Sequence, residues 1–277
     1  MTNAYRDIPG VDTVLAEPAL ASLLAGFRRD IVIEAVRTKI GEIRAGVARG
    51  EASPTSVSIA EDVARDAEAM WSSWPTSVIN ATGVILHTNL GRAPLSEESL
   101  RAVTAAAIDY SDLEIEMESG KRGSRHTAIA RLLCQLTGAE DAIVVNNNAG
   151  AVLLGLAAVA SAKDVIVSRG EASEIGGGFR IPDVLAQSGA KLVEIGTVNR
   201  TYDSDYDRAV TDNTGAILLV HRSNFRVIGF THEPDLTAVA AVGAKHDVPV
   251  LHDLGSGALI DTEAFGIGHE YMPQESL

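Results

Sequence analysis

The segment from Asn146 to Gly150 has the residue types of an anion-binding helix start. It follows an apolar run and leads into a helix, predicted over Ala149–Ala160, that is apolar enough to be interior. Asn148 is a suitable N-cap, and the two residues after it leave the first-turn N–H groups uncovered by side chains. Free N–H groups at the positive end of a helix dipole favour a phosphate. The same residues also suit a simple cap on a buried helix.

A second candidate is Asp253, which follows the apolar run Val248–Leu251 and precedes a Gly-Ser-Gly turn. Ligands of parallel α/β sheets bind at the carboxyl ends of the strands, where an Asp can anchor a cationic group. Facing a pyridinium nitrogen, its carboxylate would keep the ring protonated and able to accept electrons. Alone, Asp253 is explained as a loop cap. Together with a phosphate-binding segment it indicates a phosphorylated cofactor with a ring nitrogen. A dinucleotide is disfavoured, because the Gly-Ser-Gly turn lacks the third glycine of the dinucleotide fingerprint.

Arginines in glycine-rich segments form a third candidate group. They are Arg92 in "HTNLGRAPL", Arg122 and Arg125 in "ESGKRGSRH", and Arg180 in "EIGGGFRIP". A guanidinium group can bind an oxyanion through two parallel hydrogen bonds, although each of these residues also suits a solvated loop charge. No metal site is predicted, because the His-Glu pairs at 232 and 269 lack a second His at helical spacing.

The elements that must position these residues alternate between strands and helices. The apolar runs predict strands, and the spacing between them predicts crossover helices. The strands are expected over Ala142–Val145, Val165–Val167, Leu192–Ile195, Ala216–Val220 and Val248–Leu251, and the helices near Ala149–Ala160, Pro182–Gln187 and Asp235–His246. This order predicts an α/β fold with a mainly parallel sheet.

A helical region precedes this alternation. Apolar residues recur at helical spacing from Glu17 to Arg49 and again from Ile59 to Trp71, with Pro54 between the two stretches. We therefore expect a helical N-terminal domain over 1–75 and a sheet domain over 76–277. The helices also suit an arm packed on the main domain.

Composition limits the classes of partner. The net charge of −14 argues against broad binding of nucleic acid, and residues 1–75 hold 8 Lys/Arg against 11 Asp/Glu. A single cysteine excludes a disulfide framework and suits a reducing compartment. The chain has no apolar run of the ~18 residues that a membrane span needs, so we expect a cytoplasmic protein without membrane contact.

Several longer blocks resemble a known family. "VINATGVILHTNLGRAPLS", residues 78–96, is similar to the bacterial L-seryl-tRNA(Sec) selenium transferases, or selenocysteine synthases. The resemblance continues through "DLEIEMESGKRGSR", "VVNNNAGAV", "SRGEASEIGGGFRIPDV", "VHRSNFRVIGFT" and "LHDLGSG". It extends over essentially the whole chain, from the N-terminal helices to the final "QESL".

The resemblance implies a pyridoxal-phosphate enzyme with the large domain of aspartate aminotransferase fold type I, incomplete in this chain. It implies conversion of L-seryl-tRNA(Sec) to L-selenocysteinyl-tRNA(Sec) through an aminoacrylyl-tRNA intermediate, with selenophosphate as donor. It further implies a homo-oligomer, a ring of dimers in the family, and tRNA contact through the N-terminal domain.

The resemblance also assigns roles to residues. Asn147, Asn148, Ala149 and Gly150 would hold the cofactor phosphate, and Asp253 would pair with the pyridinium nitrogen. Arg92 would bind selenophosphate or the departing phosphate as a catalytic residue. Ser223 and Asn224 would line the cofactor pocket, and Arg122, Arg125 and Arg180 would bind substrate.

Such an enzyme needs a lysine that holds the cofactor covalently. Lys163, Lys191 and Lys245 precede predicted strands and should lie at the amino edge of the sheet, and Lys39 belongs to the N-terminal helices. Only Lys121, in a loop, could approach the cofactor, and its "GKRG" setting suits contact with a phosphate or a partner. In the family the cofactor lysine follows in a Ser-Gly-Asp-Lys segment beyond "QESL". We therefore expect this sequence to be an N-terminal portion, inactive alone and with an uncovered sheet edge. The alternatives are a related pyridoxal-phosphate-dependent lyase and a non-catalytic fragment that binds tRNA or oligomerises.

Overall fold

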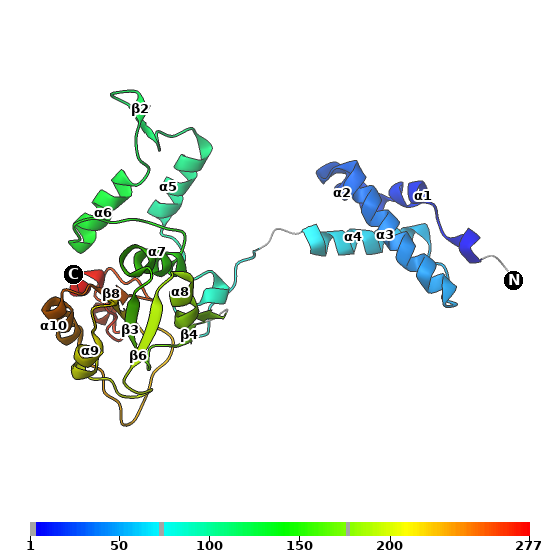
Figure 1. Cartoon of the computed structure of the whole chain (residues 1–277). Coiled ribbons are helices and arrows are strands. Elements are labelled where there is room, and N and C mark those ends of the chain that lie inside the picture. The colour runs from blue at the N-terminus through cyan, green and yellow to red at the C-terminus, as the bar shows by residue number, and fades with distance from the viewer. Residues whose placement is uncertain (1–3, 72–74, 176–177) are drawn as a thin grey trace. The chain divides into compact units, whose positions relative to one another are not determined.

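The computed structural model describes residues 4–71, 75–175 and 178–277 (Figure 1). The chain divides into two compact units, Met1–Val84 and Ile85–Leu277, so the division falls nine residues after the position expected from the sequence. Each unit has its own hydrophobic core.

The N-terminal unit is helical. Its elements are η1 (Ala4–Asp7), α1 (Val11–Leu15), η2 (Pro18–Leu20), α2 (Ala21–Gly26), α3 (Arg29–Ala48) and α4 (Ser56–Trp71). Val32, Val36 and Ile40 lie on one buried stripe of α3 and pack against Ile59 and Val63 of α4, as helical spacing predicts.

The helical pattern that began at Glu17 is not continuous. Phe27 has an extended backbone between α2 and α3, and its ring lies 4.7 Å from that of Trp71. The break thus falls at Phe27, within a stretch whose apolar spacing alone does not show it.

Four parallel strands form the sheet of the C-terminal unit. They are β3 (Asp164–Ser168), β6 (Lys191–Ile195), β7 (Thr214–Val220) and β8 (Val250–Asp253), in the order β6-β3-β7-β8. All seven residues of β7 are buried, because the strand has neighbours on both edges and helices on both faces. The predicted mainly parallel α/β fold is confirmed.

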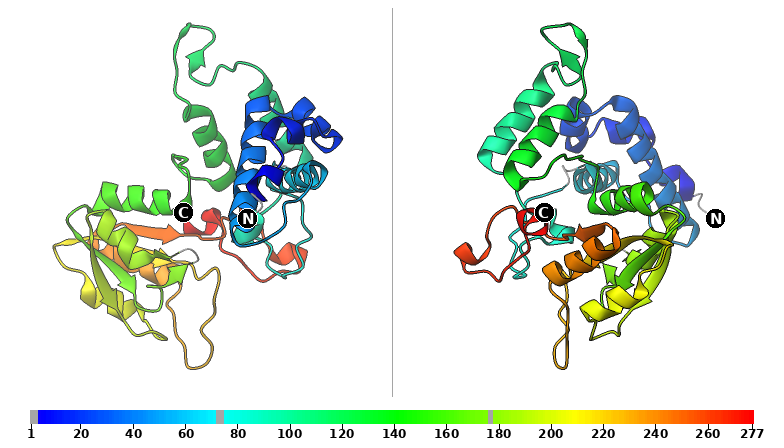
Figure 2. Two further views of the ribbon diagram at one scale, coloured as in Figure 1. Left: turned by 90° about the vertical axis from the view of Figure 1, so that its right-hand side faces the viewer. Right: turned by 60° about the vertical axis from the view of Figure 1, so that its left-hand side comes forward.

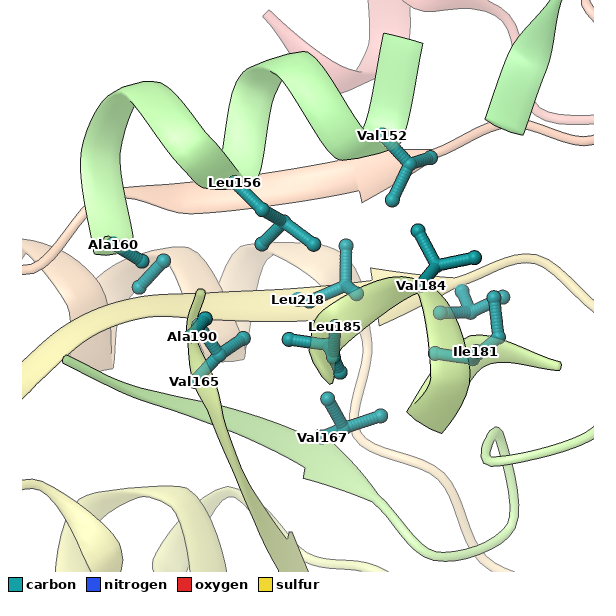
Figure 3. Close-up of a cluster of buried hydrophobic side chains, with 12 residues drawn as sticks. Val152, Leu156, Ala160, Val165, Val167, Ile181, Val184, Leu185, Ala190 and Leu218 are labelled. Carbon is teal, nitrogen blue, oxygen red and sulfur yellow. The ribbon is translucent and has the colours of Figure 1, made fainter. Parts of the chain in front are cut away.

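Two helix layers cover this sheet. Helices α7 (Asn148–Ala160) and α8 (Ile181–Gln187) share a core with inward side chains such as Val165 and Leu218 (Figure 3). Helices α9 (Asp203–Ala209) and α10 (Leu236–His246) pack on the opposite face against the alternate residues, such as Ile166 and Ile217.

One predicted strand and one predicted burial are wrong. Residues 142–145 form no strand; Val144 is 47% exposed, and it pairs with no strand among the described residues. Helix α7 is not interior all round: Val152 and Leu156 are buried, whereas Leu154 and Val159 are more than 40% exposed. Apolar composition shows that a segment can be buried, but a neighbouring element must be present to bury it.

An arm precedes α7. It contains η3 (Thr88–Leu90), α5 (Glu97–Ile108), the short hairpin β1 (Ile115–Glu116) and β2 (Lys121–Arg122), and α6 (Thr127–Thr137). Figures 1 and 2 show the hairpin at the end of this arm, away from the sheet. Neither α5 nor α6 has a buried residue.

The remaining elements are a hairpin of β4 (Glu174–Ile175) and β5 (Phe179–Arg180), η4 (Glu263–Phe265) and α11 (Pro273–Ser276). In the described part of the chain, no single helix is long and apolar enough to cross a membrane. One bent pair, Tyr5–Leu15 with Pro18–Gly26, meets the criteria of length and composition.

Candidate functional site

The structure joins the first two sequence candidates at the carboxyl edge of the sheet. The side-chain amide of Asn148 donates a hydrogen bond of 2.6 Å to the carboxylate of Asp253, across 105 residues of sequence. Asp253 is the last residue of β8, and Asn148 is the first residue of α7. A helix N-terminus and a buried acid therefore lie side by side at one edge of the sheet, as the sheet topology requires.

The capping residue of α7 differs from the prediction. Asn147, not Asn148, is the N-cap: its extended backbone precedes the helix, and its side chain accepts a 2.8 Å hydrogen bond from the Gly150 N–H. Asn148 is thereby free to orient Asp253. Three consecutive asparagines cannot be told apart by capping preference, so the tertiary contact decides which one caps.

Asp253 is in an environment that disfavours its charge. Its side chain is only 7% exposed, and burial raises the pKa of its carboxyl group, while the Asn148 amide and His221 act in the opposite direction. A protonated ring nitrogen would supply the missing positive partner.

The glycine turn after β8 contacts another candidate. A Cβ atom at Gly255 would lie 2.9 Å from the hydroxyl oxygen of Ser223, so the turn needs glycine to approach this residue. Ser223 thus lies beside the Asp253 edge. Asn224 is exposed, and its role stays a prediction.

A histidine cluster at the same edge was missed by the sequence reasoning. His221 follows β7 directly, His252 precedes Asp253 on β8, and the rings of both meet Tyr271 edge-on. Burial, together with His221, lowers the pKa of His252, whose Nδ1 lies 2.9 Å from the hydroxyl of Ser276. The available signal was the position of both histidines at strand ends.

Some buried polar atoms at this edge lack a hydrogen bond among the described residues. Within the described residues, His221 Nδ1, Ser256 Oγ and Glu270 Oε2 are buried without a hydrogen bond. Buried polar groups are nearly always paired, so these atoms indicate a polar ligand or water. With the α7 N-terminus and Asp253, they fit a phosphorylated cofactor that contains a ring nitrogen.

The candidate arginines fall into two groups. Arg122 and Arg125 both pair with Glu114 in the arm, and Arg180 pairs with Glu174 at 2.7 Å. Arg92 has no ion-pair partner among the described residues, and its backbone adopts a left-handed φ of 61°. The structure brings none of the four into a hydrogen bond with the Asp253 edge, so their roles stay predictions.

Lys163, Lys191 and Lys245 lie away from this edge, as predicted. Lys163 and Lys191 are at the amino ends of β3 and β6, and Lys245 pairs with Asp207 at 2.6 Å. Lys121 lies in the arm hairpin, and Lys39 pairs with Asp66 in the N-terminal unit. None of these five described lysines is at the carboxyl end of a sheet strand.

Comparison with known proteins gives consistent matches along the chain. Residues 78–277 match the family described as L-seryl-tRNA selenium transferase, and residues 5–44 match that described as selenocysteine synthase N terminal. An L-seryl-tRNA(Sec) selenium transferase of Geobacter sulfurreducens is 49% identical over 274 residues, covering 98% of this chain and 59% of the relative. One from Caldanaerobacter subterraneus is 45% identical, covering 99% and 60%. The chain thus spans about three fifths of these relatives' length.

A solved structure of D-glucosaminate-6-phosphate ammonia-lyase is also similar. It is 19% identical, with 60% of this chain and 45% of that chain covered and a TM-score of 0.49. A score of this size does not by itself assign a shared fold.

Proposed function

Because this chain belongs to the L-seryl-tRNA(Sec) selenium transferase family, we propose that its protein converts L-seryl-tRNA(Sec) to L-selenocysteinyl-tRNA(Sec), with selenophosphate as selenium donor. The observation that carries the proposal is the Asn148–Asp253 hydrogen bond. It places a helix N-terminus suited to phosphate beside a buried acid suited to a pyridinium nitrogen.

The proposed cofactor is pyridoxal phosphate. Its phosphate would meet the backbone N–H groups in the first turn of α7, where Asn147 keeps the helix start in place. Asp253 would hold the proton on the ring nitrogen, with its carboxylate oriented by Asn148. When bound, such a cofactor supplies an electron-accepting ring that acidifies the Cα–H of an attached amino acid.

The chain's own groups would then control protons and anions at this edge. His221 and His252, both partly buried, lie beside Asp253, and the lowered pKa of His252 favours its neutral form, which can accept a proton. Arg92, free of a carboxylate partner among the described residues, is the arginine we propose for the oxyanion of selenophosphate.

The N-terminal unit is proposed to contact the tRNA, and the whole protein to form a homo-oligomer. Arg29 and Arg44 of α3 are exposed and have no ion pair among the described residues, which leaves them available to phosphates. Replacing both with Glu should weaken a gel shift with seryl-tRNA(Sec), while Arg65→Glu, at a residue already paired with Asp62, should have less effect.

The decisive experiment uses protein purified from its native source. Incubation with seryl-tRNA(Sec) and selenophosphate radiolabelled at selenium should give label in the aminoacyl-tRNA fraction, and seryl-tRNA(Ser) serves as the control substrate. Label transfer that is equal for both tRNAs, or absent while a small sugar acid is deaminated, would contradict the proposal and favour the lyase alternative.

A further inference from the structure

Glu171 makes a bond that joins two strand ends at the site. It follows β3 by a tight turn, in which its backbone N–H donates to the Ser168 carbonyl at 2.9 Å. Its side-chain carboxylate accepts a 3.0 Å hydrogen bond from the backbone N–H of Val220, the last residue of β7. Two segments 49 residues apart are thereby tied together.

The bond occurs where the ladder between β3 and β7 stops. The two strands pair only as far as Val167 and Leu218, and β3 then turns so that the Arg169 N–H donates to Ile195 of β6. Strand β7 continues to Val220, whose N–H would have no strand acceptor. The Glu171 carboxylate takes the place of the missing β3 carbonyl.

Val220 is directly connected to the acid of the site. It is the register partner of Asp253 in the β7–β8 pair, and the next residue, His221, donates its N–H to the Asp253 carbonyl at 3.0 Å. Loss of the Glu171 bond would therefore loosen the strand end against which Asp253 is aligned.

The surroundings of Glu171 are polar and partly open to solvent. It borders a cavity of about 630 Å³ together with Tyr206, which is fully buried and whose hydroxyl lacks a hydrogen bond among the described residues. Burial raises the pKa of Glu171 to about 7, against the opposing effects of the Val220 N–H and Arg222. The other ionisable groups that line the cavity are His221, Arg226, His232, Glu233, His252 and Tyr271.

We propose that Glu171 is a positioning residue for the cofactor site: its side chain fixes the carboxyl end of β7 and, through it, the alignment of Asp253. It acts through the backbone and not on the substrate. This inference rests on the proposed function, because it concerns the site assigned there to pyridoxal phosphate.

Three variants separate the hydrogen bond from the charge and from bulk. Glu171→Gln keeps an oxygen that can accept from Val220, Glu171→Asp keeps the charge but shortens the reach, and Glu171→Leu removes the acceptor. Glu140→Leu, which removes an exposed carboxylate that has no ion pair among the described residues, is the matched control.

Equilibrium dialysis of the chain with pyridoxal phosphate supplies the first readout. We expect Glu171→Gln to bind pyridoxal phosphate within twofold of the wild type and the control to be unchanged, because both keep the hydrogen bond to Val220. Glu171→Asp and Glu171→Leu, which lose this bond, should bind it about tenfold more weakly. If Glu171→Leu does not fold, Glu171→Gln and Glu171→Asp decide the question. Wild-type affinity in Glu171→Asp, or affinity in Glu171→Gln as weak as in Glu171→Asp, would overturn the proposal.

Hydrogen exchange supplies a readout that does not need the cofactor. Exchange should be faster in Glu171→Asp than in Glu171→Gln only at the backbone N–H groups around Val220 and His221. The exchange of Val165–Val167 should be unchanged. Uniformly faster exchange would indicate a general structural role and overturn the inference. If the wild type binds no pyridoxal phosphate, the cofactor assignment fails, and the exchange pattern still tests the Glu171 contact.

Discussion

The sheet and the arm of the C-terminal unit differ in what holds them together. In β7 every residue is buried between two neighbouring strands, and the acid at the end of β8 has partners from distant segments. In α5 and α6 no residue is buried, and Leu100, Val103 and Leu132 are about half exposed. The helices of the arm thus form from local propensity and capping, whereas the sheet forms from packing.

This difference divides the candidate site. The residues proposed for the cofactor lie on the packed part, and two hydrogen bonds already link them. Arg92, Arg122 and Arg125, proposed for the substrates, lie on the arm or at its start. The exposed apolar side chains of α5 and α6 form faces that are normally covered by another surface. We therefore expect substrate binding by the arginines of the arm to depend on the surface that covers these helices.

The largest expected effect tests the packing contrast directly. Ile217→Ala in β7 should lower the free energy of unfolding by about 2–5 kcal/mol, because it leaves a cavity in a fully buried position. Leu132→Ala in α6 should change it by less than about 0.5 kcal/mol. Urea unfolding followed by circular dichroism measures both, and equal losses would show that the arm is as firmly packed as the sheet.

The next effect depends on pH. The pKa of Glu171 is about 7 in the folded chain and near 4.5 when unfolded. Between these values the unfolded state ionises first, so the folded state loses stability as pH rises from 4.5 to 7, reaching a cost of about 3 kcal/mol above pH 7. Glu171→Gln should remove this slope.

Unfolding free energies of both proteins at pH 5 and pH 8 give the test. Relative to the wild type, Glu171→Gln should have a higher free energy of unfolding at pH 8 than at pH 5. Parallel pH curves would mean that the Glu171 carboxyl titrates normally, and that its surroundings are as open to water as those of the arm.

A smaller effect concerns two helix caps. Asn147→Ala removes the side chain that accepts from Gly150 and should cost about 1 kcal/mol of unfolding free energy, because α7 is part of the core. Ser96→Ala removes the cap on α5, where the hydroxyl accepts from the Ser99 N–H. Ser96→Ala should leave the urea midpoint unchanged and only speed hydrogen exchange in α5. A shifted midpoint would contradict the difference in packing between the sheet and the arm.

The smallest expected effect is the absence of a specific covalent adduct. Incubation of residues 1–277 with pyridoxal phosphate and borohydride, followed by peptide mass mapping, should modify none of the five lysines stoichiometrically. The reasons are the positions of four lysines at the amino edge and in the arm, and the ion pair of Lys39 with Asp66. Full modification of one lysine would show that the chain brings it to the Asp253 edge in solution.

The sequence predicted most of the packed part correctly. Helices α7, α8 and α10 and strands β3, β6 and β7 lie where apolar runs and helical spacing indicated, because buried parallel strands are continuous apolar segments. Strand β8 begins at Val250, two residues later than expected, and Val248 is buried as part of the core instead. The strand expected over 142–145 shows the limit of this approach, since pairing requires a partner strand.

Residue types and spacing were enough to determine the α/β fold, the helical N-terminal region, the family blocks, and Asp253 as an acid at the end of a strand. Only the tertiary structure decided that Asn147 caps α7 while Asn148 donates to Asp253, and that Glu171 accepts from Val220. The reason is physical: periodicity and capping act within a few residues, whereas the Glu171–Val220 and Asn148–Asp253 hydrogen bonds join segments that are 49 and 105 residues apart and meet only when the sheet forms.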